Sequence, residues 1–231
     1  MNIDSNNPES EARDRFILSK GHAGVALYSV LADLGFFSNA ELNKLNQGSL
    51  FGEHPHFKVP GIEVVSGSLG HGLPIATGMA MSDKLDQKDR RTVVLMGDGE
   101  CYEGSVWEAA NFAANHKLYN LWAIIDRNGL IVSGRTEEIN QLEPFDDKWS
   151  SFGWEVVNID AHDIAELVKL FNRLQTRKVV RPVAVIASSV KGKGVSFMEN
   201  QARWHHGGIN DKNYEKARTE LMKIQNEYGD I

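Results

Sequence analysis

The sequence predicts a doubly wound α/β domain, in which a mostly parallel sheet carries helices on both faces. Four short apolar runs have the length and composition of buried strands, and they occupy residues 92–96, 121–128, 154–160 and 182–188. Helical segments alternate with these runs, at residues 105–116 and 163–174, where Asp163 is the predicted cap. This alternation predicts parallel strands joined by right-handed crossovers.

Length and composition limit the possible classes of protein. The chain has 231 residues, enough for a substantial core, and we expect an irregular arm at 1–12 and a single α/β domain at 13–231. The formal net charge of -6 argues against a general nucleic-acid or anionic-membrane surface. Cys101 is the only cysteine, which favours a reducing compartment such as the cytoplasm. No apolar run approaches the ~20 residues of a membrane span.

Further helices are expected outside this core pattern. The apolar residues Val25, Leu27, Val30, Leu31 and Leu34 recur at helical spacing and predict a helix over 24–34, with Gly35 as its stop. Ser38 and Glu41 have the spacing of a capping box for a short helix. Residues 48–66 form a long loop of a kind that is often functional, 67–85 contain a helix rich in small residues, and 210–229 form a polar amphipathic helix.

Two polar turns follow neighbouring predicted strands. Asp98 lies in a Gly-Asp-Gly turn after the first strand, and Asn128 follows the second. Ligands of such sheets bind at the carboxyl ends of the strands, where glycines let backbone N–H groups approach an anion. Carboxylate and carboxamide oxygens suit Mg²⁺ or Ca²⁺ that also holds phosphate. The alternative reading is a pair of ordinary strand-ending turns.

A family resemblance favours the first reading. The Gly-Asp-Gly turn followed by Asn128 resembles the thiamine diphosphate motif. The segments RDRFILSKGHAGVALYSVLADLGFF, GSLGHGL, KGKGVSFMEN and WHHG are similar to the diphosphate-binding domain of transketolases, specifically to the separate N-terminal subunit of split transketolases. The resemblance covers residues 13–207, which is most of the chain. It implies thiamine diphosphate and Mg²⁺ as cofactors, with Ca²⁺ as a possible substitute.

The resemblance also implies roles for residues around the cofactor. The metal ligands would be Asp98, Asn128 and the carbonyl of Leu130, and the other cofactor contacts would be Gly67, Ser68, Leu69, Gly99 and Glu100, together with Asn128 and Leu130. Two positions depart from the family pattern. Arg127 stands where the motif often has an additional Asn, and His71 stands where the family usually has Gln.

The remaining implied residues are three histidines and one glutamate. His22, His54 and His206 match histidines that contact the cofactor or move protons, with His205 as a close rival of His206, and Glu103 matches a catalytic glutamate at the interface between subunits. Without the resemblance, loop histidines are more often solvated and Glu103 would be a first-turn acid. Lys191 and Lys193 fit either a solvated loop or contact with a phosphorylated substrate.

The implied activity needs a second chain. In this family a glutamate on another domain activates the cofactor, and the sequence contains no such domain. We therefore expect a partner, the C-terminal transketolase subunit with the pyrimidine-binding domain, in an assembly of two chains of each kind. The pair would move a two-carbon ketol unit from a ketose phosphate to an aldose phosphate.

Three alternatives remain open. A specialised acyl- or ketol-transferring relative of secondary metabolism is favoured by the lack of a Ser-Gly-His-Pro-Gly segment before Arg13. A 2-oxo acid dehydrogenase alpha chain matches the motifs less well. A non-catalytic regulatory subunit conflicts with the intact Asp98 and Asn128 pair.

Overall fold

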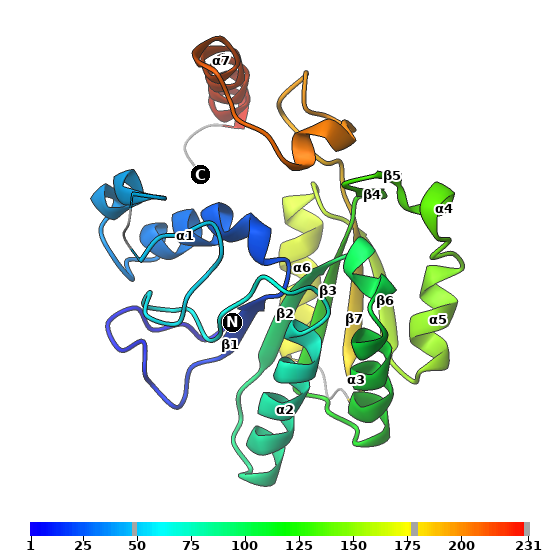
Figure 1. Ribbon diagram of the computed structural model, residues 1–231. Helices are drawn as coiled ribbons and strands as arrows, with labels where there is room; N and C mark the ends of the chain where they lie inside the picture. Colours follow the sequence, from blue (N-terminus) through cyan, green and yellow to red (C-terminus); the bar gives the residue numbers. More distant parts are fainter. Residues whose placement is uncertain (48–49, 177–179, 229–231) are drawn as a thin grey trace.

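The computed structural model describes residues 1–47, 50–176 and 180–228, and it confirms the predicted α/β architecture (Figure 1). Five parallel strands form one sheet in the order β1-β2-β3-β7-β6, and a small antiparallel hairpin pairs β4 with β5. The strands are β1 (Arg15–Leu18), β2 (Thr92–Gly97), β3 (Leu121–Arg127), β4 (Leu130–Ile131), β5 (Gly134–Arg135), β6 (Glu155–Asp160) and β7 (Val183–Ser188).

The helices lie where the sequence predicts them, with short additions. The α-helices are α1 (Gly24–Asp33), α2 (Gly72–Leu85), α3 (Gly104–Asn115), α4 (Thr136–Ile139), α5 (Phe145–Ser151), α6 (Ile164–Thr176) and α7 (Asp211–Tyr228). The 3-10 helices are η1 (Gly21–Ala23), η2 (Asn39–Lys44), η3 (Gly99–Tyr102) and η4 (Ala202–His205).

The two faces of the sheet are covered unequally (Figure 1). On one face α2, α3 and α5 pack on the strands, with Ala76, Ala110 and Trp149 fully buried between them. On the other face α6 buries Leu170 and Leu174 against strand residues. Small residues on α2 and α3 let these helices lie close together. The core on this face contains more buried residues than the core on the face covered by α6.

Strand β1 and helix α5 were not predicted, because both are short. The four residues of β1 are too few to show an alternating pattern, and the strand is defined by its parallel pairing with β2. Helix α5 is mostly polar, and only Phe145 and Trp149 enter the core. Residues 1–12 contain no helix or strand, and Asn2 holds this segment to the domain through a 2.7 Å bond from its N–H to Asp14.

Helix α1 has the predicted position, but only some of its apolar residues enter the core. Leu31 is buried, whereas Val25, Val30 and Leu34 are exposed. The reason is that α1 lies beside the sheet and packs on the loop that follows it, in a cluster formed by Tyr28, Leu31, Phe36, Phe51, Val59 and Ile62. Gly35 ends the helix with a φ of 82°, a conformation that favours glycine.

The predicted helix caps are present in different degrees. Asp163 caps α6, since its Oδ1 accepts the N–H of Glu166 at 2.8 Å. Ser38 accepts only the N–H of Ala40, at 3.3 Å, and Glu41 pairs with Lys44 instead of completing a capping box. The resulting helix, η2, is a 3-10 helix. The predicted loop 48–66 and tail helix 210–229 include residues 48, 49 and 229, which lie outside the described residues.

Helix α7 lies above the carboxyl edge of the sheet (Figure 1). It is tied to the loop after β7 by Glu220, which accepts the N–H and the hydroxyl of Ser196, both at 2.7 Å. Within residues 1–47, 50–176 and 180–228, the structure contains no helix with both the length and the apolar character needed to cross a membrane.

A buried ion pair joins α2 to the amino edge of the sheet. Asp83 is 0% exposed, and Arg90 contacts it at 2.6 and 2.8 Å while Arg15 lies 3.5 Å away. We predict that Arg90→Met lowers the free energy of unfolding by about 3 kcal/mol, because it leaves a buried carboxylate short of its main partner. Chemical denaturation measures this, and the double variant Asp83→Leu/Arg90→Met should recover part of the loss. Equal losses in the single and double variants would contradict the prediction.

Candidate functional site

The candidate site lies at the carboxyl edge of β2 and β3. These strands are neighbours, with Gly97 opposite Asp126, so the turns that follow them lie side by side. A cavity of about 290 Å³ opens at this edge. Eight of the residues implied by the sequence line it: His22, Leu69, Asp98, Gly99, Glu100, Glu103, Asn128 and Leu130. The topology thus brings together segments that are far apart in the chain.

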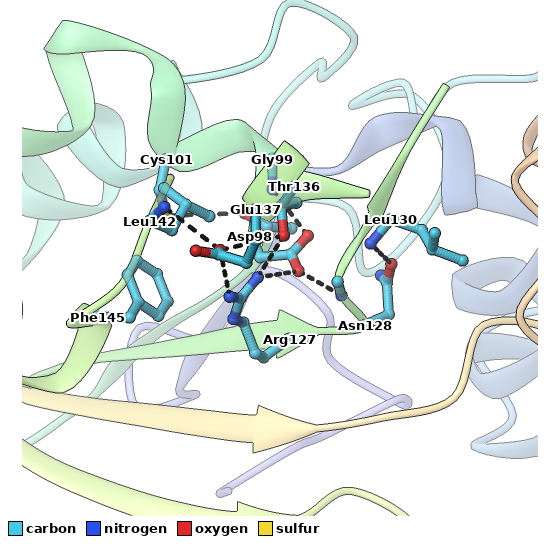
Figure 2. A network of polar contacts seen from close by, with 12 residues as sticks. Asp98, Gly99, Cys101, Arg127, Asn128, Leu130, Thr136, Glu137, Leu142 and Phe145 are labelled. Carbon is cyan, nitrogen blue, oxygen red and sulfur yellow. Dashed lines mark hydrogen bonds and ion pairs between the residues drawn. The ribbon is translucent and has the colours of Figure 1, made fainter. Parts of the chain in front are cut away.

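Asp98 is held in one orientation by the chain itself (Figure 2). Its side chain is nearly fully buried, and Oδ1 accepts the N–H of Gly99 at 2.8 Å. Oδ2 accepts the N–H of Gly129 at 2.7 Å and a guanidinium N–H of Arg127 at 3.0 Å. The turn after β2 is therefore joined directly to the turn after β3.

Asn128 and Leu130 form the second half of the site. Asn128 Oδ1 accepts the N–H of Leu130 at 3.0 Å, a local turn that leaves one oxygen lone pair for another partner. Leu130 begins β4, and Ile131 beside it packs closely on Gly99, where a Cβ would collide with it. The hairpin and the Gly-Asp-Gly turn consequently fit together only because residue 99 is glycine.

A cationic wall, formed by Lys20 and Lys191, is part of the lining of the same cavity. Lys20 pairs with Asp126 at the end of β3, and Ser189 also donates to Asp126. Lys191 lies beside it, with Nζ 3.2 Å from Nδ1 of His205. Burial and the charge of Lys20 lower the pKa of Lys191. Such a wall attracts an anion, which would relieve the repulsion between the two ammonium groups.

Sequence reasoning missed Lys20 and gave Lys191 no preferred role. Lys20 precedes the Gly-His pair of η1 and gives no periodic signal, so its position follows only from the pairing of β1 with β2. The useful clue was Asp126, a carboxylate at the end of an apolar strand. Burial alone would raise the pKa of Asp126, but Lys20 and its hydrogen bonds lower it overall.

The histidines separate into two groups. His22 and His205 both line the cavity, and their ring centroids are 5.0 Å apart. His206 is exposed and outside the cavity, so the geometry favours His205 for the role that the sequence analysis gave to His206. His54 does not line the cavity either; its ring lies against Gly67.

His22 is neutral under ordinary conditions. Its pKa is lowered to about 4, first by burial of the imidazole and then by the nearby Lys20, His205 and Lys191. A neutral imidazole has one nitrogen free to accept a proton or a hydrogen bond. The pKa of His205 is also lowered, first by burial and then by the charges of Lys191 and Lys20.

The Gly-Ser-Leu-Gly loop contributes only part of itself to the cavity. Leu69 reaches it, whereas Gly67 and Ser68 lie with His71 around a separate depression on the other side of the loop. Gly70 allows this arrangement: its φ is 81°, and a Cβ there would lie 2.5 Å from Cβ of Glu103. Glu103 is exposed at the start of α3, beside the cavity.

Glu100 is a buried carboxylate that holds several segments of the site together. It is 2% exposed, and burial raises its pKa. Oε1 accepts the hydroxyl of Ser19 and the N–H of Gly70, the latter at 2.9 Å, while Oε2 accepts the N–H of Gly97 at 3.2 Å. Because the chain already supplies these donors, the geometry favours a role in positioning three loops over direct contact with a ligand.

The donor set fits a metal that is bound together with an anionic ligand. Within the part of the chain that the structure describes, no group of three His, Cys, Asp or Glu side chains could hold a metal alone. Asp98, Asn128 and the Leu130 carbonyl supply only oxygen atoms, which suits Mg²⁺ completed by phosphate oxygens and water. The cationic wall lines the same cavity and would offer partners to the remaining negative charge of such a ligand.

We predict that proton titration by NMR gives His22 a pKa of about 4. Because the unfolded value is about 6.5, the unfolded chain binds more protons between these values, so this group reduces stability as the pH falls from about 6.5 to about 4. The variant His22→Gln should lose that part of the pH dependence, and Lys191→Met should raise the pKa of His22. An unchanged pKa in Lys191→Met would contradict this account of the site.

Comparisons with known proteins agree with this geometry. Residues 1–227 match the family described as transketolase, thiamine diphosphate binding domain. One relative, from Phocaeicola vulgatus, is named as a subunit of apulose-4-phosphate transketolase; it is 45% identical over 225 residues, covering 96% of this chain and 79% of that protein. Another, from Clostridium sp., is named as the 6-deoxy-6-sulfo-D-fructose transketolase subunit SqwG; it is 40% identical over 225 residues, covering 96% of this chain and 82% of that protein.

Solved structures show the same relationship. The fold matches the transketolase of Campylobacter jejuni with a TM-score of 0.89 and 30% identity, over 95% of this chain and 36% of that one. This chain therefore spans about a third of the length of that transketolase. Because the family match covers nearly the whole sequence and includes the cavity at the edge of β2 and β3, the chain belongs to the family of transketolase thiamine diphosphate-binding domains.

Proposed function

We propose that this chain is the thiamine diphosphate- and Mg²⁺-binding subunit of a two-chain transketolase. The assembled enzyme transfers a two-carbon ketol unit from a ketose phosphate to an aldose phosphate. One observation carries the proposal: Asp98, Asn128, Lys20 and Lys191 line a single cavity. A metal diphosphate requires both oxygen ligands for the metal and cations for the phosphate charge.

The chain's residues would hold the cofactor by its charged end. Asp98, Asn128 and the carbonyl of Leu130 bind Mg²⁺, with Ca²⁺ as a possible substitute, and Gly99 contributes a backbone donor close to the diphosphate. Leu69 provides an apolar surface for the ring portion. When bound, thiamine diphosphate supplies the electron sink on which a carbon–carbon bond can be broken.

The histidines would handle the protons of the ketol transfer. A neutral His22 can accept a proton from a substrate hydroxyl, and its contact with the ring of His205 places a second imidazole within the same cavity. His54 and His206 remain candidates for contacts that form on the substrate side. Glu103, exposed at the cavity rim, is suited to an interface between subunits.

A partner chain should complete the site. The relatives of similar length are named as transketolase subunits, whereas the one-chain transketolases are about three times as long. We infer a C-terminal subunit with a pyrimidine-binding domain, which brings the activating glutamate, in an assembly of two chains of each kind. Cys101 is buried and free, which supports a reducing, cytoplasmic location.

The second candidate is a specialised relative with a different substrate. It is supported by the names of two relatives, which refer to apulose-4-phosphate and to 6-deoxy-6-sulfo-D-fructose. Both names describe an anionic sugar, so the same cationic wall and cofactor grip would serve either candidate. A regulatory, non-catalytic subunit is disfavoured by the intact set of Asp98, Asn128 and Leu130.

The activity is tested by mixing the chain with a C-terminal transketolase subunit, thiamine diphosphate and Mg²⁺. Transfer from xylulose 5-phosphate to ribose 5-phosphate would support the main proposal. Cofactor binding without this transfer, combined with turnover of apulose-4-phosphate or 6-deoxy-6-sulfo-D-fructose, would support the specialised relative. A complex that binds no cofactor would refute both.

For the cofactor grip, we predict that Asp98→Ala removes Mg²⁺-dependent binding of thiamine diphosphate, because it deletes the only carboxylate in the ligand set. Isothermal titration of the complex measures this. Asp86→Ala is the matched control, since Asp86 is an exposed carboxylate at the end of α2. Retained binding in Asp98→Ala would show that the Gly-Asp-Gly turn does not hold the metal.

A further inference from the structure

Arg127 occupies a position between two residues with functions of their own. In a strand, successive side chains point to opposite faces. Asp126 contacts Lys20 and Ser189, while Arg127 extends the other way and contacts the turn after β2 (Figure 2). The residue that departs from the family pattern is therefore a direct neighbour of the proposed metal ligand Asp98.

The guanidinium of Arg127 is bound on several sides. One nitrogen donates to Asp98 at 3.0 Å and to Thr136 at 2.9 Å, and the other donates to Glu137 at 2.7 Å and to Glu143 at 2.8 Å. Its carbon lies 5.5 Å from the ring centre of Phe145, and the side chain is only 13% exposed. Burial alone would lower the pKa of Arg127, but its carboxylate partners raise it above its usual range.

These contacts join β3, which carries Arg127, to three other segments of the chain. Asp98 belongs to the turn after β2, and Thr136 and Glu137 begin α4. Glu143 and Phe145 stand at the start of α5. The rigid fork of an arginine can bind acceptors on several sides in one plane, which a lysine cannot do. The segments at α4 and α5 thus fix the guanidinium, and the guanidinium in turn fixes Asp98.

The acceptor positions of Asp98 show what this achieves. A carboxylate offers about four lone-pair positions, two on each oxygen. Oδ2 uses both, for Gly129 and Arg127, whereas Oδ1 uses one, for Gly99. One lone pair of Oδ1 is left, and it belongs to the oxygen that Arg127 does not touch. We propose that Arg127 is a positioning residue that occupies Oδ2 of Asp98 and so makes Oδ1 the single oxygen presented to Mg²⁺.

This inference rests on the proposed function, because it requires Asp98 to be a metal ligand. If Arg127 only stabilised the fold, its substitution would lower the free energy of unfolding and weaken cofactor binding equally with Mg²⁺ and with Ca²⁺. Loss of orientation has a more selective effect, since Mg²⁺ demands near-ideal octahedral geometry while Ca²⁺ accepts irregular and bidentate carboxylate ligands. The ratio of Mg²⁺- to Ca²⁺-supported binding therefore separates the two roles.

The test uses the complex of the chain with its partner subunit and isothermal titration of thiamine diphosphate in Mg²⁺ or in Ca²⁺. In Arg127→Gln we expect Mg²⁺-supported affinity to fall about 10–100-fold, the range typical for residues that orient metal ligands. Ca²⁺-supported affinity should fall at least about tenfold less. Arg127→Lys, which keeps the charge but loses the fork, should lie between wild type and Arg127→Gln.

Arg90→Gln is the matched control. Arg90 is also buried and also binds an aspartate, Asp83, but at the amino edge of the sheet. This variant should lose stability without changing the ratio between the two metals. If Arg127→Gln does not fold, Arg127→Lys gives the decisive ratio.

The outcomes distinguish this proposal from the function on which it rests. Equal losses of affinity with both metals in the Arg127 variants, or no loss with either, would overturn the positioning role. The proposed function would still stand if the wild-type complex binds thiamine diphosphate with Mg²⁺. If Asp98→Ala binds the cofactor as well as wild type, the metal assignment itself fails.

Discussion

The pairing of β2 with β3 is the constraint on which the site depends. Because Gly97 lies opposite Asp126, the two strands end at the same level of the sheet, and the turns that follow them lie next to each other. Parallel strands buried on both faces cannot slip without moving every apolar side chain, so this register is strongly fixed. An oxygen-rich pair of turns is thereby set on the most rigid part of the molecule, where the thick core of α2 and α3 supports it.

Two buried charged groups transmit that rigidity to the loops. Glu100 holds the segments around Ser19 and Gly70 against the end of β2. Arg127 connects Asp98 to the segments at α4 and α5. Buried charges are costly unless they are fully hydrogen-bonded, and both groups are bound on several sides. The cavity is consequently shaped by polar contacts between loops more than by apolar packing.

The charge distribution matches the chemistry expected of the family. The chain as a whole is acidic, with a net charge of -6, yet Lys20 and Lys191 both line the cavity. Burial, and after it the charge of Lys20, lowers the pKa of both Lys191 and His22, so an anion in the cavity would be favoured. A diphosphate with its metal would be such an anion, while the neutral histidines stay available for proton transfer.

The sequence by itself determined the α/β class, the main strands and helices, and the pair Asp98 and Asn128, because these features are written in local periodicity and in strand-end motifs. It missed β1 and α5, which are too short to show a period. Only the tertiary structure decided which side chains share the cavity: it brought in Lys20, favoured His205 over His206, and gave Arg127 its contacts. These choices depend on strand order and loop packing, which bring together residues far apart in sequence, and no local pattern encodes such proximity.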